Sequence, residues 1–110
     1  MLAPGELIFR AASREFRLTA MRSVTDGRFY VMFLDATSGV STYGGFRTLD
    51  VQAVPDGMWT VLDFNRAENP PCSYSKLLAC PLPPIENRIV LPVEAGEKLP
   101  PTNRGPAIAP

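Results

Sequence analysis

The distribution of proline is the feature of this 110-residue sequence that most restricts its fold. Proline fixes the backbone φ angle and has no N–H to donate, so it is excluded from helix interiors and from central strands. Two of the twelve prolines precede residue 60, and the rest lie between Pro70 and Pro110. The last third of the chain is therefore predicted to be mostly irregular, with regular structure concentrated before it.

The first two-thirds of the chain shows the period-two alternation that is typical of β-strands. Residues 15–21 alternate polar with apolar side chains, as a half-buried strand does. The run 28–34 is rich in aromatic and branched residues, so we expect a central strand buried on both faces. Similar patterns predict further strands at 6–10, 46–51, 58–64 and 88–91. Trp59 is assigned to the core.

Turn signals separate these predicted strands. Residues 11–14 fit a hairpin loop, and residues 35–39 form a polar turn. Asp-Gly pairs at 26–27 and 56–57 tolerate the positive φ that tight hairpin turns require. Strands about ten residues apart with turns between them predict a mostly β fold, a small antiparallel meander or a partial barrel.

The proline-rich part of the chain interrupts the strand pattern after residue 64. Residues 65–87 are predicted to be an irregular segment that carries both cysteines, and 75–79 could form at most one short helical turn. Residues 1–98 are expected to form a single β domain, and residues 99–110 a flexible tail.

Charge and hydrophobicity argue against two classes of partner. Eleven basic and eleven acidic side chains give a net charge of zero, and the two signs are interleaved along the chain. Nucleic-acid binders gather Lys and Arg on one face, so no nucleic-acid binding is expected. The sequence has no signal-peptide pattern and no apolar run of about 20 residues. We therefore expect a cytoplasmic location and no membrane contact.

The absence of histidine restricts the chemistry of the chain. It removes Ser-His-Asp and Cys-His catalysis and the commonest metal ligand. Phosphate-loop and dinucleotide-binding motifs are also missing, so no cofactor and no metal site are predicted. An enzyme would have to be a hydrolase-like one that uses Asp63 with Cys72 or Asp35.

The densest group of polar side chains follows the predicted strand 58–64. It comprises Asp63, Asn65, Arg66, Asn69 and Cys72. Loops on a rigid scaffold often carry function, and the planar guanidinium of Arg66 suits a carboxylate or phosphate. The same polar groups could instead satisfy each other and the backbone of an irregular loop. Both interpretations stay open at this point.

A second candidate site involves Asp35 and Tyr43. The turn that begins at Asp35 and the Tyr43-Gly44-Gly45 segment could line the mouth of a pocket, because glycine lets the backbone approach a ligand. Asp, Ser, Thr and Gly are also the ordinary residues of a turn between strands, which favours a structural role.

The two cysteines, Cys72 and Cys80, allow several chemical states. We favour reduced thiols packed against the prolines, since free cysteine behaves as a small buried hydrophobe. A disulfide would close a nine-residue loop, worth about 2–3 kcal/mol in the chain-entropy model, but a cytosolic location disfavours it. A metal site would need ligands beyond two cysteines, and a nucleophilic cysteine would need activation by Arg66, Lys76 or a helix N-terminus.

Seven short motifs occur in a fixed order along the chain. They are DATSG at 35–39, TYG at 42–44, DFNRA at 63–67, NPPC at 69–72, CPLPP at 80–84, ENR at 86–88 and EAGEK at 94–98. Over roughly residues 5–98 the sequence resembles the C-terminal part of the bacterial and archaeal family called domain of unknown function 1684. The resemblance implies no established activity, and it implies longer members with a further N-terminal portion.

Three functional hypotheses follow. The first is a non-catalytic β module that binds a small polar or anionic ligand, or a partner protein, through residues 63–87. The second is the hydrolase-like enzyme described above. The third is a structural unit that assembles with another chain, for example as a homodimer, because a missing N-terminal portion would leave a sheet edge or an apolar patch exposed.

Overall fold

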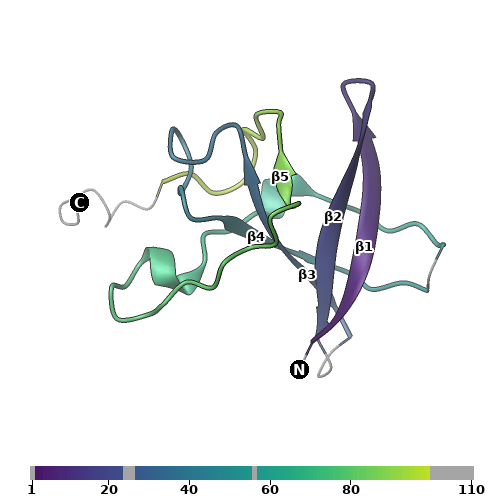
Figure 1. Cartoon of the computed structure of the whole chain (residues 1–110), viewed down its shortest axis with the longest axis horizontal. Helices are drawn as coiled ribbons and strands as arrows, with labels where there is room; N and C mark the ends of the chain where they lie inside the picture. Colours follow the sequence, from purple (N-terminus) through teal and green to yellow (C-terminus); the bar gives the residue numbers. More distant parts are fainter. Residues whose placement is uncertain (1, 24–26, 56, 100–110) are drawn as a thin grey trace.

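The computed structural model describes residues 2–23, 27–55 and 57–99, and within them it contains five strands and two single-turn 3₁₀ helices (Figure 1). The elements in chain order are β1 (Leu2–Ala11), β2 (Arg14–Ser23), β3 (Phe29–Asp35), β4 (Arg47–Val51), η1 (Phe64–Arg66), η2 (Pro71–Ser73) and β5 (Arg88–Ile89). Strands β1 to β4 form an antiparallel meander in sequence order, and β5 pairs parallel with β3. The sheet is open, so the predicted mostly β meander is confirmed.

Strands β1 and β2 form a long hairpin around a two-residue loop. Ten residue pairs join them, from Leu2 opposite Ser23 to Ala11 opposite Arg14. The loop residues Ala12 and Ser13 have φ angles of 51° and 63°, as the type I′ turn of a tight hairpin requires. The hairpin predicted at 11–14 is confirmed, although neither loop residue is a glycine.

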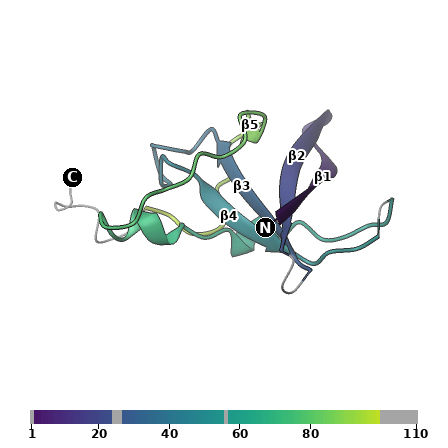
Figure 2. The same ribbon diagram turned by 60° about the horizontal axis from the view of Figure 1, so that its bottom comes forward.

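Strand β3 has different neighbours along its length. Its start pairs with β2 at only two positions, Met21 with Tyr30 and Arg22 with Phe29. Beyond them the β1–β2 hairpin diverges from β3 and β4, as Figure 2 shows. The end of β3 pairs instead with β5. One edge of β3 is therefore shared between two partners.

Asn87 fills the gap where β2 and β3 separate, and it is only 1% exposed. Its side-chain Oδ1 accepts the backbone N–H of Thr19 at 2.8 Å. Its Nδ2 donates to the carbonyl oxygens of Thr19 and Met32 at 2.8 and 2.9 Å. The side-chain amide thus takes the place of a peptide group between the strands, and it satisfies backbone groups that would otherwise lack partners.

The hydrophobic core lies on one face of the sheet. Its buried members are Leu7, Phe16, Leu18, Ala20, Phe29, Val31, Phe33, Leu49, Val51, Ala67 and Ile89. Phe64 of η1 packs edge-on against Phe33, with ring centroids 5.4 Å apart, and so fixes the start of the irregular segment on the core. Strand β3 alternates buried with half-buried residues, so the expectation of burial on both faces was too strong.

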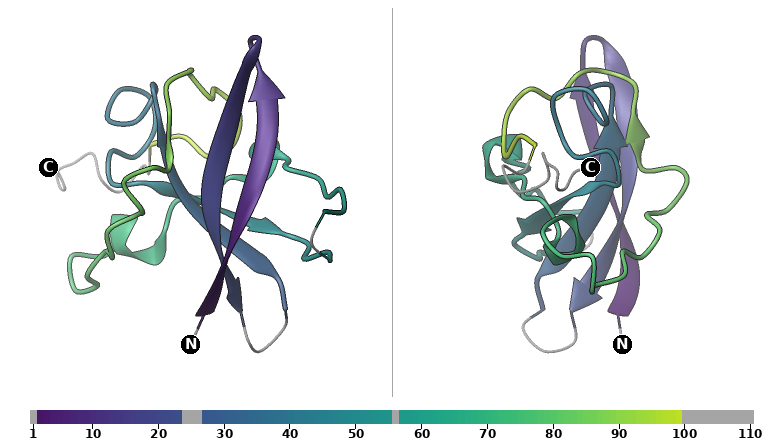
Figure 3. Two further views of the ribbon diagram at one scale, coloured as in Figure 1. Left: turned by 45° about the vertical axis from the view of Figure 1, so that its right-hand side comes forward. Right: turned by 90° about the vertical axis from the view of Figure 1, so that its left-hand side faces the viewer.

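The strand predicted at 58–64 is wrong. Residues 57–63 contain no strand, and Trp59 is 92% exposed rather than part of the core. Residues 52–55 and 57–63 form an arm that projects past β1 (Figures 1 and 3). A hydrogen bond of 2.9 Å from the Thr60 hydroxyl to the carbonyl of Gln52 ties its two sides together. The alternating pattern is present, but none of the strands in the described part of the chain pairs with the arm.

The remaining predictions of helix, strand and turn positions agree with the structure only in part. The helical turn predicted at 75–79 is a hydrogen-bonded turn, and the two 3₁₀ helices lie elsewhere. The last strand is shorter than expected and ends at Ile89. Asp56 of the turn predicted at 55–57 lies outside the described residues, and on either side of it the Met58 N–H donates to the Pro55 carbonyl at 3.1 Å. Residues 24–26, 56 and 100–110 lie outside the described part of the chain, so the Asp26-Gly27 turn and most of the predicted tail do too. No helix in the described part is long and apolar enough to span a membrane.

Candidate functional site

The seven candidate residues of the sequence fall into four separate places. Asp35 lies at the end of β3 and is buried. Tyr43 and Cys72 meet at a disulfide bond. Asn69 anchors the last described segment of the chain. Asp63, Asn65 and Arg66 belong to the η1 turn.

Asp35 forms a buried ion pair with Arg47. The Arg47 Nη2 lies 3.2 Å from the Asp35 Oδ1, and the two side chains are 1% and 0% exposed. The other carboxylate oxygen accepts three hydrogen bonds, from the backbone N–H of Val93 at 2.7 Å and from the N–H and hydroxyl of Thr37 at 3.0 and 2.8 Å. Both oxygens of the Asp35 carboxylate therefore have partners within the protein.

The electrostatics of Asp35 follow from these contacts. Burial raises the pKa of its carboxyl, but the hydrogen bonds from Val93 and Thr37 and the charge of Arg47 outweigh burial. The net effect holds the pKa of Asp35 below its ordinary value. Arg47 also donates to the carbonyl oxygens of Val93 at 2.9 Å and Ala95 at 2.6 Å. The Asp35–Arg47 pair therefore holds residues 93–97 in place and does not line the mouth of a pocket. We call this ion pair the Asp35–Arg47 clamp.

Gly96 and Asn69 secure the same segment from its other side. Gly96 has a φ of +87°, and a Cβ there would lie 2.7 Å from the Phe64 carbonyl oxygen. The Asn69 backbone N–H donates to the Glu97 carboxylate at 2.6 Å, and its side-chain Nδ2 donates to the Lys98 carbonyl at 2.8 Å. Asn69 therefore serves the fold, although its buried Oδ1 has no hydrogen-bond partner among the described residues.

The Tyr74 side chain also contacts this segment, at the protein surface. Its hydroxyl donates to the Glu97 carboxylate at 2.6 Å. Burial, followed by this bond to a carboxylate, raises the pKa of the Tyr74 phenol. The family motif at 94–98 is accordingly a structural strap, held by backbone and side-chain contacts from three other segments.

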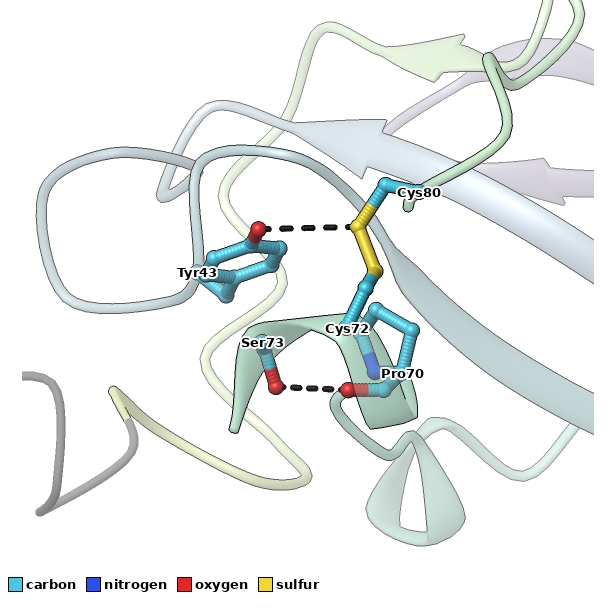
Figure 4. The surroundings of a disulfide bond; sticks show 5 residues. All are labelled: Tyr43, Pro70, Cys72, Ser73 and Cys80. Carbon is cyan, nitrogen blue, oxygen red and sulfur yellow. Dashed lines mark hydrogen bonds between the residues drawn. A yellow bond between two sulfur atoms is a disulfide. The ribbon is translucent and has the colours of Figure 1, made fainter. Parts of the chain in front are cut away.

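Cys72 and Cys80 form a disulfide bond, with their Cα atoms 5.4 Å apart (Figure 4). The expectation of reduced, packed thiols is therefore wrong. The η2 turn and the proline-rich return of the chain bring the two Cα atoms to the separation that a disulfide needs. The Tyr43 hydroxyl lies 3.6 Å from the Cys80 sulfur, and the Tyr43 ring occupies the space where a side chain at Gly45 would be. Tyr43 thus packs on the disulfide.

The η1 turn presents a polar cleft on the surface. Asp63 caps the turn by accepting the Asn65 N–H at 3.1 Å. Arg66 lines two adjoining hollows of about 520 and 530 Å³. Arg28 and Asp50 line both hollows with it, and Glu68 lines one. We call the surface formed by Arg28, Asp50, Arg66 and Glu68 the Arg66 cleft.

The acidic side of the cleft is positioned by the sheet. Asp50 lies on β4 opposite Tyr30 of β3. Burial and then the charge of Asp50 raise the pKa of the Tyr30 phenol. Glu68 is held beside β4 by two backbone hydrogen bonds to Thr48, of 2.8 and 2.9 Å. The guanidinium of Arg66 makes no ion pair and no hydrogen bond with any residue that the structure describes, so its donors are open to a ligand.

Comparison with known proteins identifies the family. The family model described as "Protein of unknown function (DUF1684)" matches residues 1–98. The chain belongs to this family. A solution NMR structure of an uncharacterized protein from Haloarcula marismortui is similar, with a TM-score of 0.74 and 35% sequence identity over 84% of this chain. The match covers 53% of that protein, so this chain spans about half its length. No curated protein matches the sequence.

The resemblance that the seven motifs indicated is thereby confirmed, and the structure explains several of them within this DUF1684 domain. The motif at 35–39 supplies Asp35, which pairs with Arg47, and the motif at 94–98 supplies Ala95, whose carbonyl accepts a hydrogen bond from Arg47. The ENR motif contains Asn87, which joins β2 to β3. Most of the motifs therefore encode the fold.

Sequence reasoning missed part of the candidate site in this DUF1684 domain. It placed Asp63 and Arg66 together, and in the structure both line one hollow. It did not find Arg28 or Asp50, because β-pairing brings them to the cleft from distant parts of the chain, and it did not single out Glu68, two residues after Arg66. The available signal at Arg28 and Asp50 was a charged residue in a predicted strand. Among the described residues no group of three or more Cys, Asp or Glu side chains could hold a metal ion.

Proposed function

We propose that this DUF1684 chain is a non-catalytic binding module and that the Arg66 cleft is its ligand site. The observation that supports it is the uncommitted guanidinium of Arg66 in a hollow that also contains Arg28 and two carboxylates. Asp35, Asn69 and Cys72 are engaged in holding the fold together. Within the predicted 63–87 segment, Arg66 and Glu68 both line this cleft.

The side chains of the cleft define the class of ligand. A guanidinium presents a planar fork of donors that matches a carboxylate or a phosphate. Asp50 and Glu68 supply acceptors on the same surface, which suits a hydroxyl or an amine. The proposed ligand is therefore a small molecule with one anionic group and at least one hydrogen-bond donor.

The hydrolase-like alternative has less support. Cys72 is in a disulfide and has no thiolate to act as a nucleophile. The Asp35 carboxylate is paired with Arg47 and buried, so it has no path to a substrate. The disulfide also favours an oxidising compartment, because cytosolic thiols are kept reduced. The cytoplasmic location expected from the sequence stays a prediction.

An NMR titration of the isotopically labelled chain tests the proposal. We expect inorganic phosphate and citrate to shift the backbone amides of residues 28, 50, 66 and 68 before others. The Arg66→Gln variant should lose these shifts, and Arg88→Gln, which removes an exposed arginine outside the cleft, should keep them. Equal shifts in all three proteins, or shifts scattered over the surface, would contradict the proposal.

A further inference from the structure

The outer edge of β1 is unpaired. Within the described part of the chain β1 pairs with β2 alone, along its whole length. A long edge strand presents a row of backbone donors and acceptors that favours pairing with another strand. The solvent-facing side chains of the central part of this edge are Glu6, Ile8 and Arg10, all exposed. Ile8 is half exposed although it is apolar.

The hairpin geometry determines which backbone groups of β1 point away from β2, toward the free edge. A two-residue loop is closed by a hydrogen-bonded pair, here Ala11 with Arg14. Hydrogen-bonded pairs then recur at every second residue, so Leu7 and Phe9 direct their N–H and C=O groups toward β2. Glu6, Ile8 and Arg10 direct theirs toward the free edge. The open hydrogen-bonding positions are thus the same three residues whose side chains face solvent.

These three residues are self-complementary about a two-fold axis. If two copies of β1 pair antiparallel with Ile8 opposite Ile8, then Glu6 of each copy lies opposite Arg10 of the other. This register forms two opposite-charge pairs, and such directly opposed pairs stabilise a sheet. It also places only outward-facing backbone groups against each other, as a continuous ladder requires. The ladder ends at Pro4, which has no N–H to donate.

An apolar groove runs along the same edge. It has a volume of about 650 Å³ and lies between residues 6–10 of β1 and residues 57–64. Its apolar lining includes Met58 and Trp59, which are 64% and 92% exposed. The arm that carries them extends beyond β1 (Figure 3). An added strand would therefore find both a backbone ladder and an apolar surface beneath it.

We propose that two copies of this chain form a symmetric dimer by pairing their β1 edges about Ile8. The charge pattern of the edge selects a second copy over an unrelated strand, since Glu6 and Arg10 are spaced to satisfy each other across the axis. The proposal does not depend on ligand binding at the Arg66 cleft.

Light scattering coupled to size-exclusion chromatography gives the first test. The intact chain should elute with twice its monomer mass of 12.0 kDa at micromolar to submillimolar concentration. Trp59 is the sole tryptophan, so its fluorescence should move to shorter wavelength as dilute monomers associate. A monomer at all these concentrations, or a dimer without a change in Trp59 emission, would overturn the proposal.

Charge-reversal variants test the register itself. Glu6→Arg and Arg10→Glu should each weaken dimerisation by tenfold or more, because each replaces two opposite-charge pairs with two like-charge pairs. Mixing the two variants should restore assembly as a heterodimer, which native mass spectrometry separates from either homodimer by mass. Assembly of each variant alone, or no preference for the heterodimer, would contradict the register.

Two further variants distinguish pairing between β1 edges from the stability of the β1–β2 hairpin. Arg17→Gln breaks the 3.1 Å ion pair of Glu6 with Arg17 from the β2 side, so it should leave dimerisation unchanged. Ile8→Pro removes an outward N–H that β2 does not use, and it should give a monomer with a retained β circular-dichroism spectrum. Thermal unfolding of each variant confirms that the chain is folded.

Discussion

The Asp35–Arg47 clamp gives the sharpest prediction about how this fold is held together. The Asp35→Asn substitution keeps the size of the side chain and removes its charge. One oxygen can still accept from Val93 and Thr37, but the guanidinium of Arg47, with its side chain 1% exposed, then has no counter-charge. Removing one partner of a buried pair is destabilising because the remaining charge is left uncompensated.

The structure sets the size of this effect. Breaking a buried ion pair costs about 3–5 kcal/mol, and we expect the lower end because Arg47 keeps hydrogen bonds to the carbonyls of Val93 and Ala95. A loss of about 3 kcal/mol corresponds to a fall in Tm of about 12–24 °C for a domain of this size. Urea and thermal denaturation followed by circular dichroism, with the disulfide intact, measure both quantities.

The pH dependence of the same variant provides a second readout. The pKa of Asp35 is lowered in the folded state, so its stabilisation is complete above its unfolded pKa and is lost as the pH falls through the folded value. The ordinary value is 3.8. The stability difference between wild type and Asp35→Asn should therefore be large at pH 7 and narrow as the pH falls below about 4.

Two comparisons would refute this reasoning. Asp50→Asn changes an exposed carboxylate on β4 and should alter stability by less than about 0.5 kcal/mol. If Asp35→Asn costs no more than this control, the clamp does not stabilise the domain. Combining Asp35→Asn with Arg47→Met removes the uncompensated charge and should recover part of the loss. A double variant no more stable than the single one would also contradict the account.

Three further perturbations test other parts of the fold. Asn87→Ala leaves three backbone groups between β2 and β3 without their partner and should cost about 2–4 kcal/mol in urea unfolding, whereas the exposed Asn65→Ala should be near neutral. Gly96→Ala forces a side chain into a left-handed conformation against the neighbouring backbone and should cost about 2 kcal/mol or more by thermal unfolding; a neutral result would mean that the strap shifts freely. Replacing Cys72 and Cys80 together with serine opens a nine-residue loop and should lower unfolding free energy by about 2–3 kcal/mol, and an unchanged value would show that the bond adds no stability.

Local sequence patterns were enough for most of the sheet. The β1–β2 hairpin, β3 and β4 follow from alternation and turn residues that act over a few neighbouring positions. The strand predicted at 58–64 was wrong because alternation indicates only a local preference for β-strand conformation. It does not show that a partner strand is present. Trp59 was assigned to the core for the same reason, and it lies on an exposed arm.

The features that could not be predicted from the sequence depend on contacts between residues far apart in the chain. The disulfide between Cys72 and Cys80 depends on how the chain returns after η2, and compartment arguments pointed the other way. Asp63 and Arg66 could be grouped from the sequence because they are neighbours around one turn. Asp50 reaches the same cleft only through the pairing of β4 with β3.

Native mass spectrometry of the purified chain, followed by the same sample under denaturing conditions, tests the proposed binding function most directly. The account predicts extra mass that leaves on denaturation, retained in Arg88→Gln and lost in Arg66→Gln. A wild-type chain that carries no such mass, and that takes up neither phosphate nor citrate when they are added, would contradict the assignment of the Arg66 cleft as a ligand site.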